Sequence, residues 1–520
     1  MLCLARVVLS SDATLMTTYR NVPFANFLGC TPSERVPSFL FNIIAPSIDH
    51  EEGVAPFAPY GGRKIEASLL RQYQRNEVVY AHPEHVEKFI DEDTRIVALS
   101  EMDPLGLGPV TMMFTMGGKL TGYSKKRFVE LCERINRIRQ KRNLKFKVVV
   151  GGPGTWQLDV RPETSRLLGV DHLIIGETEH VIDHVFQDIE KGERPEVIKI
   201  PTWPKKHEIP PIVNPSMQSI VEVMRGCGRN CEYCDPNLRA ARYMDHEKIL
   251  DEVEVNVKGG ISNVWLHSED VFLYQLEDHK NFMPNRDALV DLFRTVISAP
   301  GVTHLNPTHG TIAPAAADPQ LIKDLSFEVG AGPRNWIGIQ PGLETGSPEL
   351  VKKYMHYKAK PFSGEEWQDV VMNGTYAFNE NYWFPAYTLI IGLPGETEDD
   401  TWETVRLIDK LEKQLPEKLG NRAHFTATPL SFVPIGILRD KEFFDIEGMV
   451  NEARFALIYR CWRHSVLEAE RFPQILEKIS PAMRLFMSQL VKRGSRSILW
   501  FIERWGKKLG YDPEKALRVN

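Results

Sequence analysis

In the first part of the chain, short apolar runs alternate with stretches in which apolar residues recur every three or four positions. Residues 63–75 carry Ile65, Leu69 and Tyr73 at helical spacing, whereas residues 146–150 are almost continuously apolar. Continuously apolar strands that alternate with helices are typical of a doubly wound parallel sheet. We therefore predict a flavodoxin-like α/β domain. Its predicted strands are 5–10, 77–81, 94–100, 146–150 and 172–175, and its predicted helices are 63–75, 85–91 and 123–142.

A second series of β/α units follows further along the chain. It begins with an apolar run at residues 219–224, and amphipathic stretches separate the later runs. Six such units predict a partial (β/α)6 barrel, and a barrel carries its chemistry at the carboxyl ends of its strands. The predicted strands are 219–224, 262–267, 302–306, 336–340, 386–391 and 424–430, and the predicted helices include 246–257, 286–298 and 366–378.

Three further segments lack this alternation. After its first strand, the chain up to residue 60 predicts a long loop, and such a loop is more often a wall or a lid than a spacer. Residues 192–218 hold six prolines and predict a linker. Residues 432–520 predict a helical region that forms a cap, a packed bundle, or a basic surface for a partner or a membrane. The helices expected there are 446–468, 475–492 and 496–508, and the predicted domains are 1–191, 192–218, 219–431 and 432–520.

The composition is that of an ordinary globular protein, with 42% hydrophobic and 25% charged residues. A net charge of −6 gives no argument for nucleic acid or an anionic membrane as a partner. No apolar run is long enough for a transmembrane helix, and the first residues do not predict a signal peptide. Because Cys3, Cys30, Cys132 and Cys461 are scattered, we predict no disulfide framework and a reducing, cytoplasmic location.

Three other cysteines lie within eight residues, at Cys227, Cys231 and Cys234, with the spacing C-x3-C-x2-C. Three closely spaced thiolates can hold three corners of an iron–sulfur cube, so that the fourth iron stays open to an outside molecule. Zinc sites usually use two separated pairs of ligands, and the sequence has no second C-x2-C pair. The remaining alternative is three core cysteines that meet by chance, although free cysteines are otherwise sparse in this chain.

The spacing resembles the signature of the radical SAM superfamily, and an aromatic residue just before the third cysteine matches it as well. The resemblance implies a 4Fe–4S cluster on the three cysteines, S-adenosylmethionine on its open iron, and a partial barrel around both. Where the superfamily often has two glycines, this chain has Ser268, Glu269 and Asp270, and either carboxylate would then pair with the ammonium group. The residues implied to contact S-adenosylmethionine are Tyr233, Ser268, Glu269, Glu344 and Gly392.

Glycines and acidic residues follow three strands of the first domain. Glycine lets a bulky ligand approach the backbone, and such sheets bind ligands at the carboxyl ends of their strands. Next to the cysteine motif, this arrangement resembles the cobalamin-binding domain of cobalamin-dependent radical SAM enzymes. The D-x-H-x-x-G stretch of many cobalamin proteins has Asp103 in the histidine position, so no histidine ligand to cobalt is expected. A nucleotide-binding or ligand-free domain is the alternative. The residues implied to contact cobalamin are Glu101, Met102, Asp103, Gly106, Gly151, Gly152, Gly154, Gly176 and Glu177.

The resemblance implies a class B radical SAM C-methyltransferase, which moves a methyl group from S-adenosylmethionine through cobalamin to an unactivated carbon. It also implies a flavodoxin or ferredoxin-type reductant. Residues 58–64 and 101–108 resemble methanogen members of this class, which implies a protein or peptide substrate, such as the α-carbon of a glutamine in methyl-coenzyme M reductase. Two alternatives stay open: an enzyme that forms a carbon–carbon bond or a ring in a membrane lipid, and an iron–sulfur protein that binds cobalamin without turnover.

Overall fold

The computed structural model describes residues 5–19, 25–471 and 481–516. The chain divides into two compact units, and each is described by itself. Unit 1 comprises Met1–Val221, Met244–Val264 and Ala299–Thr303, and unit 2 comprises Glu222–Tyr243, Trp265–Ser298 and His304–Asn520.

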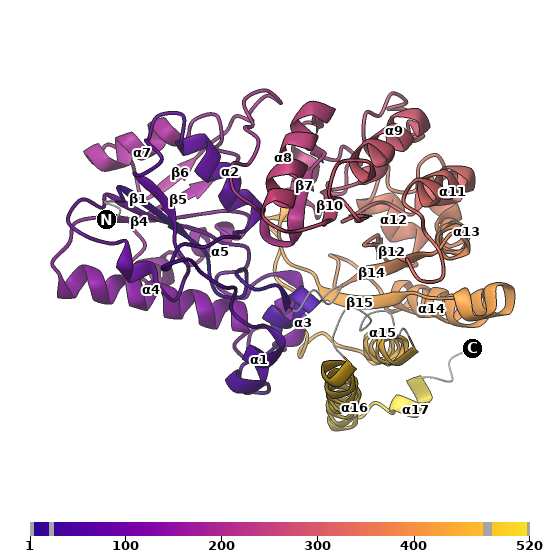
Figure 1. Cartoon of the computed structure of the whole chain (residues 1–520). Coiled ribbons are helices and arrows are strands. Elements are labelled where there is room, and N and C mark those ends of the chain that lie inside the picture. Colours follow the sequence, from indigo (N-terminus) through magenta and orange to yellow (C-terminus); the bar gives the residue numbers. More distant parts are fainter. Residues whose placement is uncertain (1–4, 20–24, 472–480, 517–520) are drawn as a thin grey trace. The chain divides into compact units, whose positions relative to one another are not determined.

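A six-stranded parallel sheet forms the centre of unit 1, in the order β2–β1–β3–β4–β5–β6 (Figure 1). All five predicted strands are confirmed, with ends that move by at most two residues. Central parallel strands are covered on both faces, which explains why they are continuously apolar in the sequence. The strands are β1 (Val7–Ser10), β2 (Val78–Tyr80), β3 (Ile96–Ser100), β4 (Lys147–Gly151), β5 (His172–Ile175) and β6 (Val197–Lys199).

Helices cover both faces of this sheet. The helix predicted at 123–142 is confirmed as α4 (Tyr123–Lys141), and Phe128, Leu131 and Ile135 on it pack with Val97 and Val148 of the sheet. On the other face, α2 (Tyr60–Leu69) and α7 (Ile182–Lys191) pack against a second set of strand residues. The remaining helices of this unit are α1 (Ser38–Ile44), α3 (Pro109–Phe114), α5 (Trp156–Asp159), α6 (Pro162–Leu167), α8 (His246–Lys258) and the 3-10 turns η2 (Ala25–Cys30), η3 (Val86–Lys88) and η4 (Met217–Ser219).

Three predictions for unit 1 need correction. The segment predicted as a linker contains β6, which pairs with β5; Pro195 and Pro201 flank this edge strand, where the missing N–H groups do no harm. The predicted N-terminal loop contains η2 and α1, and Phe41 of α1 stacks on Tyr123 with ring centroids 3.8 Å apart. The helix predicted at 85–91 is only the turn η3, because so short a segment gains little from helix formation.

A buried ion pair joins α2 to α8, although nearly two hundred residues separate them. Lys64 and Glu252 form the pair with side chains that are each 1% exposed, and the Tyr60 hydroxyl donates to the same carboxylate at 2.7 Å. The carbonyl of Pro210 accepts a further hydrogen bond from Lys64 at 2.7 Å. The two charges are thus fully enclosed, and the pair explains why α8 belongs to unit 1.

The strands of the predicted barrel form two sheets, in the orders β11–β10–β7 and β12–β14–β13 with β15 also on β14. The strands β12 and β13 both pair parallel with β14, at successive positions, so they act as one strand interrupted near Pro341. All six predicted strands are present. They are β7 (Ile220–Glu222), β10 (Asn263–His267), β11 (His304–Pro307), β12 (Ile337–Ile339) with β13 (Gly342–Glu344), β14 (Trp383–Ile391) and β15 (Thr426–Ser431), and a short antiparallel pair is β8 (Met224–Arg225) with β9 (Arg242–Tyr243).

The helices of unit 2 include the two that were predicted within it, at α9 and α13. Each β/α connection of this unit carries at least one of them. The helices are α9 (Arg286–Ile297), α10 (Ala313–Ala317), α11 (Pro319–Glu328), α12 (Pro348–Tyr354), α13 (Trp367–Glu380) and α14 (Glu398–Leu419), and the 3-10 turns are η5 (Asp235–Leu238), η6 (Val271–Leu273), η7 (Gly364–Glu366), η8 (Gly420–Arg422) and η9 (Gly436–Leu438).

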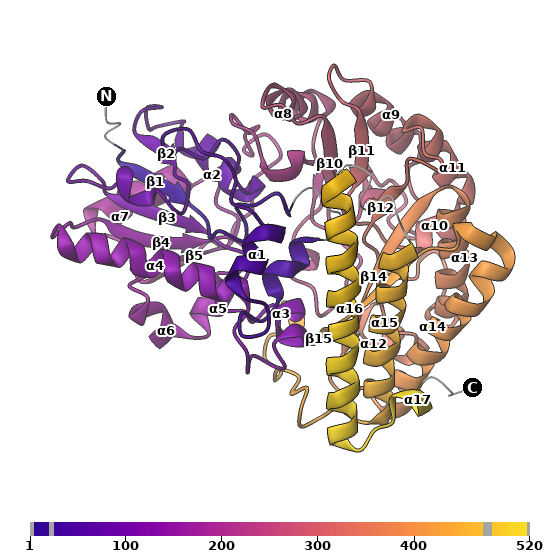
Figure 2. The same ribbon diagram turned by 60° about the horizontal axis from the view of Figure 1, so that its bottom comes forward.

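The C-terminal region is helical as predicted, but its helices differ. The structure has α15 (Glu452–Arg471), α16 (Pro481–Leu509) and α17 (Pro513–Ala516), and α15 packs on both α14 and α16 (Figure 2). The two helices expected at 475–492 and 496–508 are one helix over their described part, because Gly494 and Ser495 do not break it. Residues 475–480 of that prediction lie outside the described residues. Within the described parts of the chain, no helix is both long and apolar enough to cross a membrane.

The Lys64–Glu252 pair gives a test of this architecture. Replacing Lys64 by Met leaves the Glu252 carboxylate buried without its cation, and breaking a buried pair in this way costs about 3–5 kcal/mol. We expect Lys64→Met to lower the free energy of unfolding by that amount in urea titrations followed by circular dichroism. Lys206→Met is the matched control, because Lys206 pairs with Asp245 at the surface of the same unit and such pairs contribute less than about 1 kcal/mol. Equal losses in the two variants would contradict the enclosed pair.

Candidate functional site: a three-cysteine loop and a strand-end cavity

The three cysteines lie on the loop that connects β8 to η5. The backbone of this loop is tied to α12 and the residue after it, because Cys231 bridges to Met355 and the Glu232 N–H donates to the Tyr354 carbonyl at 3.0 Å. Gly226, just before the loop, has a φ of +85°, and a Cβ there would lie 2.5 Å from the Ala240 carbonyl oxygen. A bulkier residue would therefore push the loop open. Cys231 is buried, and the other two cysteines are half-buried.

The three thiols are withdrawn from water, and burial raises the pKa of each of them, that of Cys234 to about 12. They influence one another electrostatically, since the negative charge of Cys231 also raises the pKa values of Cys227 and Cys234. Buried thiols with raised pKa values stay protonated at neutral pH, and iron would displace these protons, because a metal deprotonates the thiol that it binds.

Among the described residues, no group of three or more His, Cys, Asp and Glu side chains is arranged to hold a single metal ion. A single ion needs its ligands around one point, as in a zinc site. A cube accepts its thiolates at separate corners, so it does not require that convergence. The loop therefore fits a polynuclear cluster better than it fits one zinc ion.

Arg229, between the first two cysteines, forms a buried ion pair with Asp270. Its Nε donates to the Asp270 carboxylate at 2.7 Å, and its Nη1 donates to the Tyr357 carbonyl at 3.1 Å. The side chains of Arg229 and Asp270 are only 2% and 1% exposed. Nη2 is also buried, and it has no acceptor in the described residues. One hydrogen-bond donor beside the cysteine loop is thus left for another group.

A second buried cation, Lys358, lies on the other side of the loop. Its Nζ donates to Glu344 Oε1 at 2.8 Å and to the Tyr233 hydroxyl at 3.2 Å. The positive charge of Lys358 counteracts the effect of burial on the pKa values of Cys231 and Cys234. Glu344 itself has a φ of +62°, which is strained for a residue with a Cβ, and such strain concentrates at functional sites.

The other residues predicted to contact S-adenosylmethionine have different surroundings. Ser268 is fully buried, and its hydroxyl has no partner among the described residues. Glu269 accepts the Gly226 N–H at 3.0 Å, and burial raises the pKa of its carboxyl group. A Cβ on Gly392 would lie 2.2 Å from the Phe444 ring, so packing on Phe444 already requires glycine there. Of the two carboxylates considered for the ammonium group, Asp270 is taken by Arg229.

These observations test whether the residues fit the implied groups. Three buried thiols, two buried cations and two buried polar groups without partners, Ser268 Oγ and Arg229 Nη2, surround one loop. Such unpaired groups are costly unless a bound group satisfies them. The site therefore fits an anionic cluster with a polar ligand.

Sequence reasoning missed Arg229, Lys358 and His309. The imidazole of His309, just after β11, is buried, and burial lowers its pKa to about 4, so it is neutral at physiological pH. A parallel bridge joins His309 to Gln340 at the end of β12. Only Arg229 had a signal in the sequence, its position inside the cysteine motif; the other two follow from the order of the strands.

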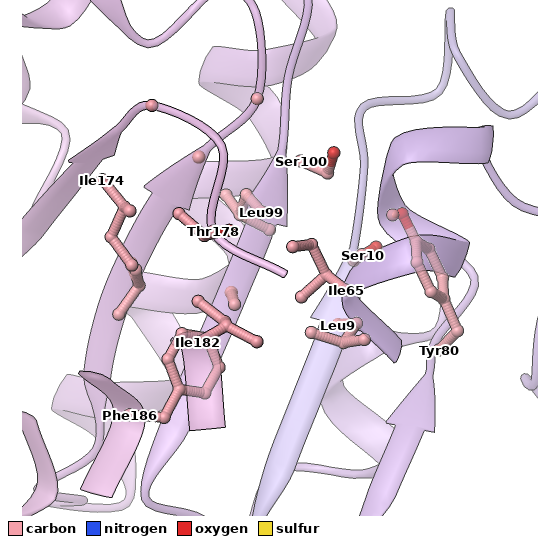
Figure 3. Close-up of a pocket in the computed structure, with 16 residues that line it drawn as sticks. Leu9, Ser10, Ile65, Tyr80, Leu99, Ser100, Ile174, Thr178, Ile182 and Phe186 are labelled. Atoms are coloured by element: carbon pink, nitrogen blue, oxygen red, sulfur yellow. The ribbon is translucent and has the colours of Figure 1, made fainter. Parts of the chain in front are cut away.

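In unit 1, a cavity opens at the carboxyl ends of the strands (Figure 3). Its volume is about 470 Å³, the part open to solvent included. Polar groups at its rim come from Ser10, Ser100 and Thr178, whereas Leu99, Ile174, Ile182 and Phe186 form an apolar wall between the sheet and α7. A deep apolar slot with a polar rim is typical of a site for an organic cofactor or ligand.

Three of the nine residues predicted to contact cobalamin, Gly151, Gly152 and Gly176, line this cavity. Gly152 and Gly154 are glycines for a further reason, which corrects the explanation from ligand approach alone. A Cβ on Gly152 would lie 2.6 Å from the Glu101 carbonyl oxygen, and one on Gly154 would lie 2.4 Å from that of Met102. The two loops thus pack backbone to backbone. Glu101, Met102, Asp103, Gly106, Gly154 and Glu177 are not part of the cavity lining.

Asp103 is fully engaged within its own loop. One oxygen accepts the Gly108 N–H at 2.8 Å and the Gln157 amide at 2.7 Å, and the other accepts the hydroxyls of Thr111 and Ser124. With four donors on two oxygens, the carboxylate has no free lone pair for a metal. Asp103 therefore holds the loop in shape instead of replacing the missing histidine as a cobalt ligand.

Glu101 and Asp12 form a buried pair of carboxyl groups at the ends of β3 and β1. Glu101 Oε1 accepts the Asp12 N–H at 3.0 Å, and the two carboxyl groups are hydrogen-bonded to each other. Burial raises the pKa values of both groups, and the negative charge of Asp12 raises that of Glu101 further. The pair therefore holds a proton at neutral pH, because two adjacent buried carboxylates cannot both ionise.

Comparison with protein families gives one match, since residues 221–408 match the radical SAM superfamily. This part of the chain, from β7 into α14, is a radical SAM domain. The arrangement of the whole chain is similar to a solved structure, that of the radical S-adenosylmethionine methyltransferase TsrM from Kitasatospora setae with tryptophan substrate and a SAM analogue bound. The TM-score is 0.51 at 13% sequence identity, over 84% of this chain and 75% of TsrM, so the likeness is one of fold.

Among curated proteins, the relatives include methylthiotransferases. The probable threonylcarbamoyladenosine tRNA methylthiotransferase of Pyrococcus horikoshii is 24% identical over 293 residues, which are 54% of this chain and 61% of the relative. The ribosomal protein uS12 methylthiotransferase RimO of Leptospira biflexa is 26% identical over 274 residues, 48% of this chain and 54% of the relative. The chain thus spans less than two thirds of the length of these relatives.

The carboxyl pair in unit 1 predicts a pH dependence of stability. Because the folded-state pKa of Glu101 is raised above its unfolded value of about 4.3, the folded protein binds more protons than the unfolded chain over the pH range between the two values. Its stabilising contribution is present at low pH and is lost as the pH rises through that range. Glu101→Gln keeps the acceptor for Asp12 and removes the titration. We expect this variant to gain stability over wild type when the pH is raised from about 5 to about 8.

Thermal unfolding across that pH range measures the effect. Glu193→Gln, at an exposed position of the same unit, is the control and should follow the wild-type curve. The same pH slope in Glu101→Gln and wild type would refute a proton held between the two buried carboxyl groups.

Proposed function

We propose that this chain, whose residues 221–408 form a radical SAM domain, is a cobalamin-dependent radical SAM methyltransferase. The observation that carries the proposal is the buried three-cysteine loop with two unpartnered polar groups beside it. Bound at this loop, a 4Fe–4S cluster with S-adenosylmethionine supplies radical chemistry that no amino-acid side chain can perform. The similarity in fold to a radical S-adenosylmethionine methyltransferase agrees with this assignment.

In this proposal, Cys227, Cys231 and Cys234 hold three irons, and the surrounding side chains bind and orient the ligand of the fourth. Glu344 and Ser268 provide an anionic acceptor and a hydroxyl in a largely dehydrated site. Lys358 neutralises Glu344 until a ligand with its own positive charge arrives. Water exclusion matters here, because a reactive radical must meet its substrate before it meets solvent.

Cobalamin is proposed for the strand-end cavity of unit 1. The apolar slot between the sheet and α7 would take an organic arm of the cofactor, and the rim formed by Ser10, Ser100 and Thr178 would hydrogen-bond to it. Gly151 leaves the mouth open, because a Cβ there would meet no atom closer than 4.0 Å. No histidine stands in the first loop, so the protein would hold the cofactor without a histidine on cobalt.

The proposed substrate is a protein or peptide, and the first to test is the glutamine segment of methyl-coenzyme M reductase. The resemblance of residues 58–64 to methanogen proteins supports kinship more than substrate choice. Arg63 and Lys64 in that stretch are 1% exposed and are used in ion pairs within unit 1, so they do not face a substrate. Residues 101–108 likewise form the loop that Asp103 organises.

Methylthio transfer is the second candidate, because the relatives are named for it. A methylthio group brings a sulfur atom as well as a methyl group, so this reaction needs a sulfur donor. The cysteines outside the loop are far apart in the sequence, and no second cysteine-rich segment exists to hold another cluster. Transfer of a methyl group alone needs no such donor, and we therefore favour it.

An anaerobic turnover experiment tests the proposal. The reconstituted protein is supplied with hydroxocobalamin, a reductant, methyl-deuterated S-adenosylmethionine and a glutamine peptide from methyl-coenzyme M reductase. We expect 5′-deoxyadenosine, S-adenosylhomocysteine and a peptide that is heavier by one deuterated methyl group, followed by mass spectrometry. Cys231→Ala should abolish all three products, because one corner of the cluster loses its ligand. Cys461→Ala, which removes a buried thiol of α15, is the matched control and should retain them.

The alternatives give different products. A peptide heavier by a methylthio group would support the second candidate, and label in added lipid would support modification of a membrane lipid. Formation of 5′-deoxyadenosine that is unaffected by leaving out cobalamin would overturn the assignment of unit 1. Binding of S-adenosylmethionine by the reduced protein without cleavage would overturn catalysis as a whole.

A further inference from the structure

Arg229 is distinguished from the other arginines near the cysteine loop by its complete enclosure. Its guanidinium lies 5.2 Å from the centre of the Phe282 ring, with Asp270 on Nε and the Tyr357 carbonyl on Nη1. These contacts fix the plane of the guanidinium, yet Nη2 keeps no acceptor in the described structure while it is buried. Desolvating such a donor costs about 1–3 kcal/mol, so an unfilled position beside it is expected to receive an acceptor.

The charges around the guanidinium indicate what that acceptor is. Arg229 lies close enough to Cys227 and Cys231 for its positive charge to lower both thiol pKa values, and the Arg229 N–H donates to the Cys227 sulfur. Asp270 is itself held in place: the Thr311 N–H donates to Oδ1 at 3.0 Å and its hydroxyl donates to Oδ2. The ion pair is thus an anchored one, with a donor left over on the side of the thiols.

A cluster held by three thiolates is an anion, and it gains one more negative charge when it accepts an electron. A fixed positive charge at short range in a low-dielectric site stabilises the more negative state. Hydrogen bonds to the sulfurs of such clusters act in the same direction, and both are among the factors that set reduction potentials.

We propose that Arg229 is a positioning and charge-tuning residue that donates Nη2–H to an acceptor of the bound cluster and raises its reduction potential. Asp270 holds the guanidinium in that orientation and offsets part of its charge. The proposal rests on the proposed function only in that a 4Fe–4S cluster occupies the loop. It requires neither cobalamin nor an identified substrate, and the electron comes from an added reductant.

Variants of opposite charge effect test the proposal. Arg229→Gln removes the positive charge, so its cluster should be harder to reduce, with a midpoint potential more negative than that of wild type. Asp270→Asn removes the opposing negative charge and should shift the potential in the positive direction. Arg229→Lys keeps the charge and loses the planar fork, so it should lie between wild type and Arg229→Gln. The readout is the midpoint potential from anaerobic spectroelectrochemical titration, with iron and sulfide content determined on the same samples.

Arg439→Gln is the matched control. Arg439 follows η9, which hydrogen-bonds to the same cysteine loop through the Ile437 N–H and the Glu232 carbonyl, but its side chain is exposed to solvent. Solvent screens its charge, so the potential should stay at the wild-type value. An equal shift in Arg439→Gln and Arg229→Gln would overturn the proposal.

The sign of the shifts separates tuning from a merely structural role. If Arg229 only braces the loop, both Arg229→Gln and Asp270→Asn loosen it and move the potential in the same direction, which would overturn the proposal. An unchanged potential in a fully loaded Arg229→Gln would do the same. If Arg229→Gln binds no iron, Arg229→Lys and Asp270→Asn decide by their opposite or equal signs. A wild-type protein that binds no cluster would instead refute the proposed function, and the inference with it.

Discussion

Charge compensation beneath the cysteine loop is the constraint on which the rest of unit 2 depends. Three thiols and two cations are withdrawn from water within one small region, and isolated buried charges of that kind are prohibitively costly. Each cation therefore has its own carboxylate, Asp270 for Arg229 and Glu344 for Lys358. These two carboxylates come from the ends of β10 and β13, so the strands of the barrel have to place them. The order of the strands is thus required by the electrostatics of the loop.

Unit 1 solves a related problem with backbone instead of side chains. The loops after β3 and β4 contact each other so closely that Gly152 and Gly154 leave no space for a Cβ. Asp103 then collects four donors, and Glu101 shares a proton with Asp12. The polar groups of these loops are therefore satisfied within the loops. The cavity beside them keeps an apolar wall and a few polar groups at its rim, which suits a large organic cofactor.

Much of the fold could be predicted from the sequence, because continuously apolar runs and amphipathic helices report burial directly. Strands β1 to β5 and the six strands of the barrel were expected, and the cysteine spacing located the loop. The edge strand β6 was missed because prolines suggested a linker, although proline is tolerated at the ends of an edge strand. Lys358 and His309 could not be predicted, since a residue far from a motif becomes part of a site only through the order in which strands assemble.

The central claim is that three thiolates bind a 4Fe–4S cluster whose fourth iron is open to S-adenosylmethionine. The most direct test is electron paramagnetic resonance of the anaerobically reconstituted and reduced protein, before and after S-adenosylmethionine is added. An open iron takes the ligand directly, so we predict about four irons per chain and a signal that changes on addition. A reduced cluster with an unchanged signal would contradict the claim, since its irons would then all be closed to the ligand.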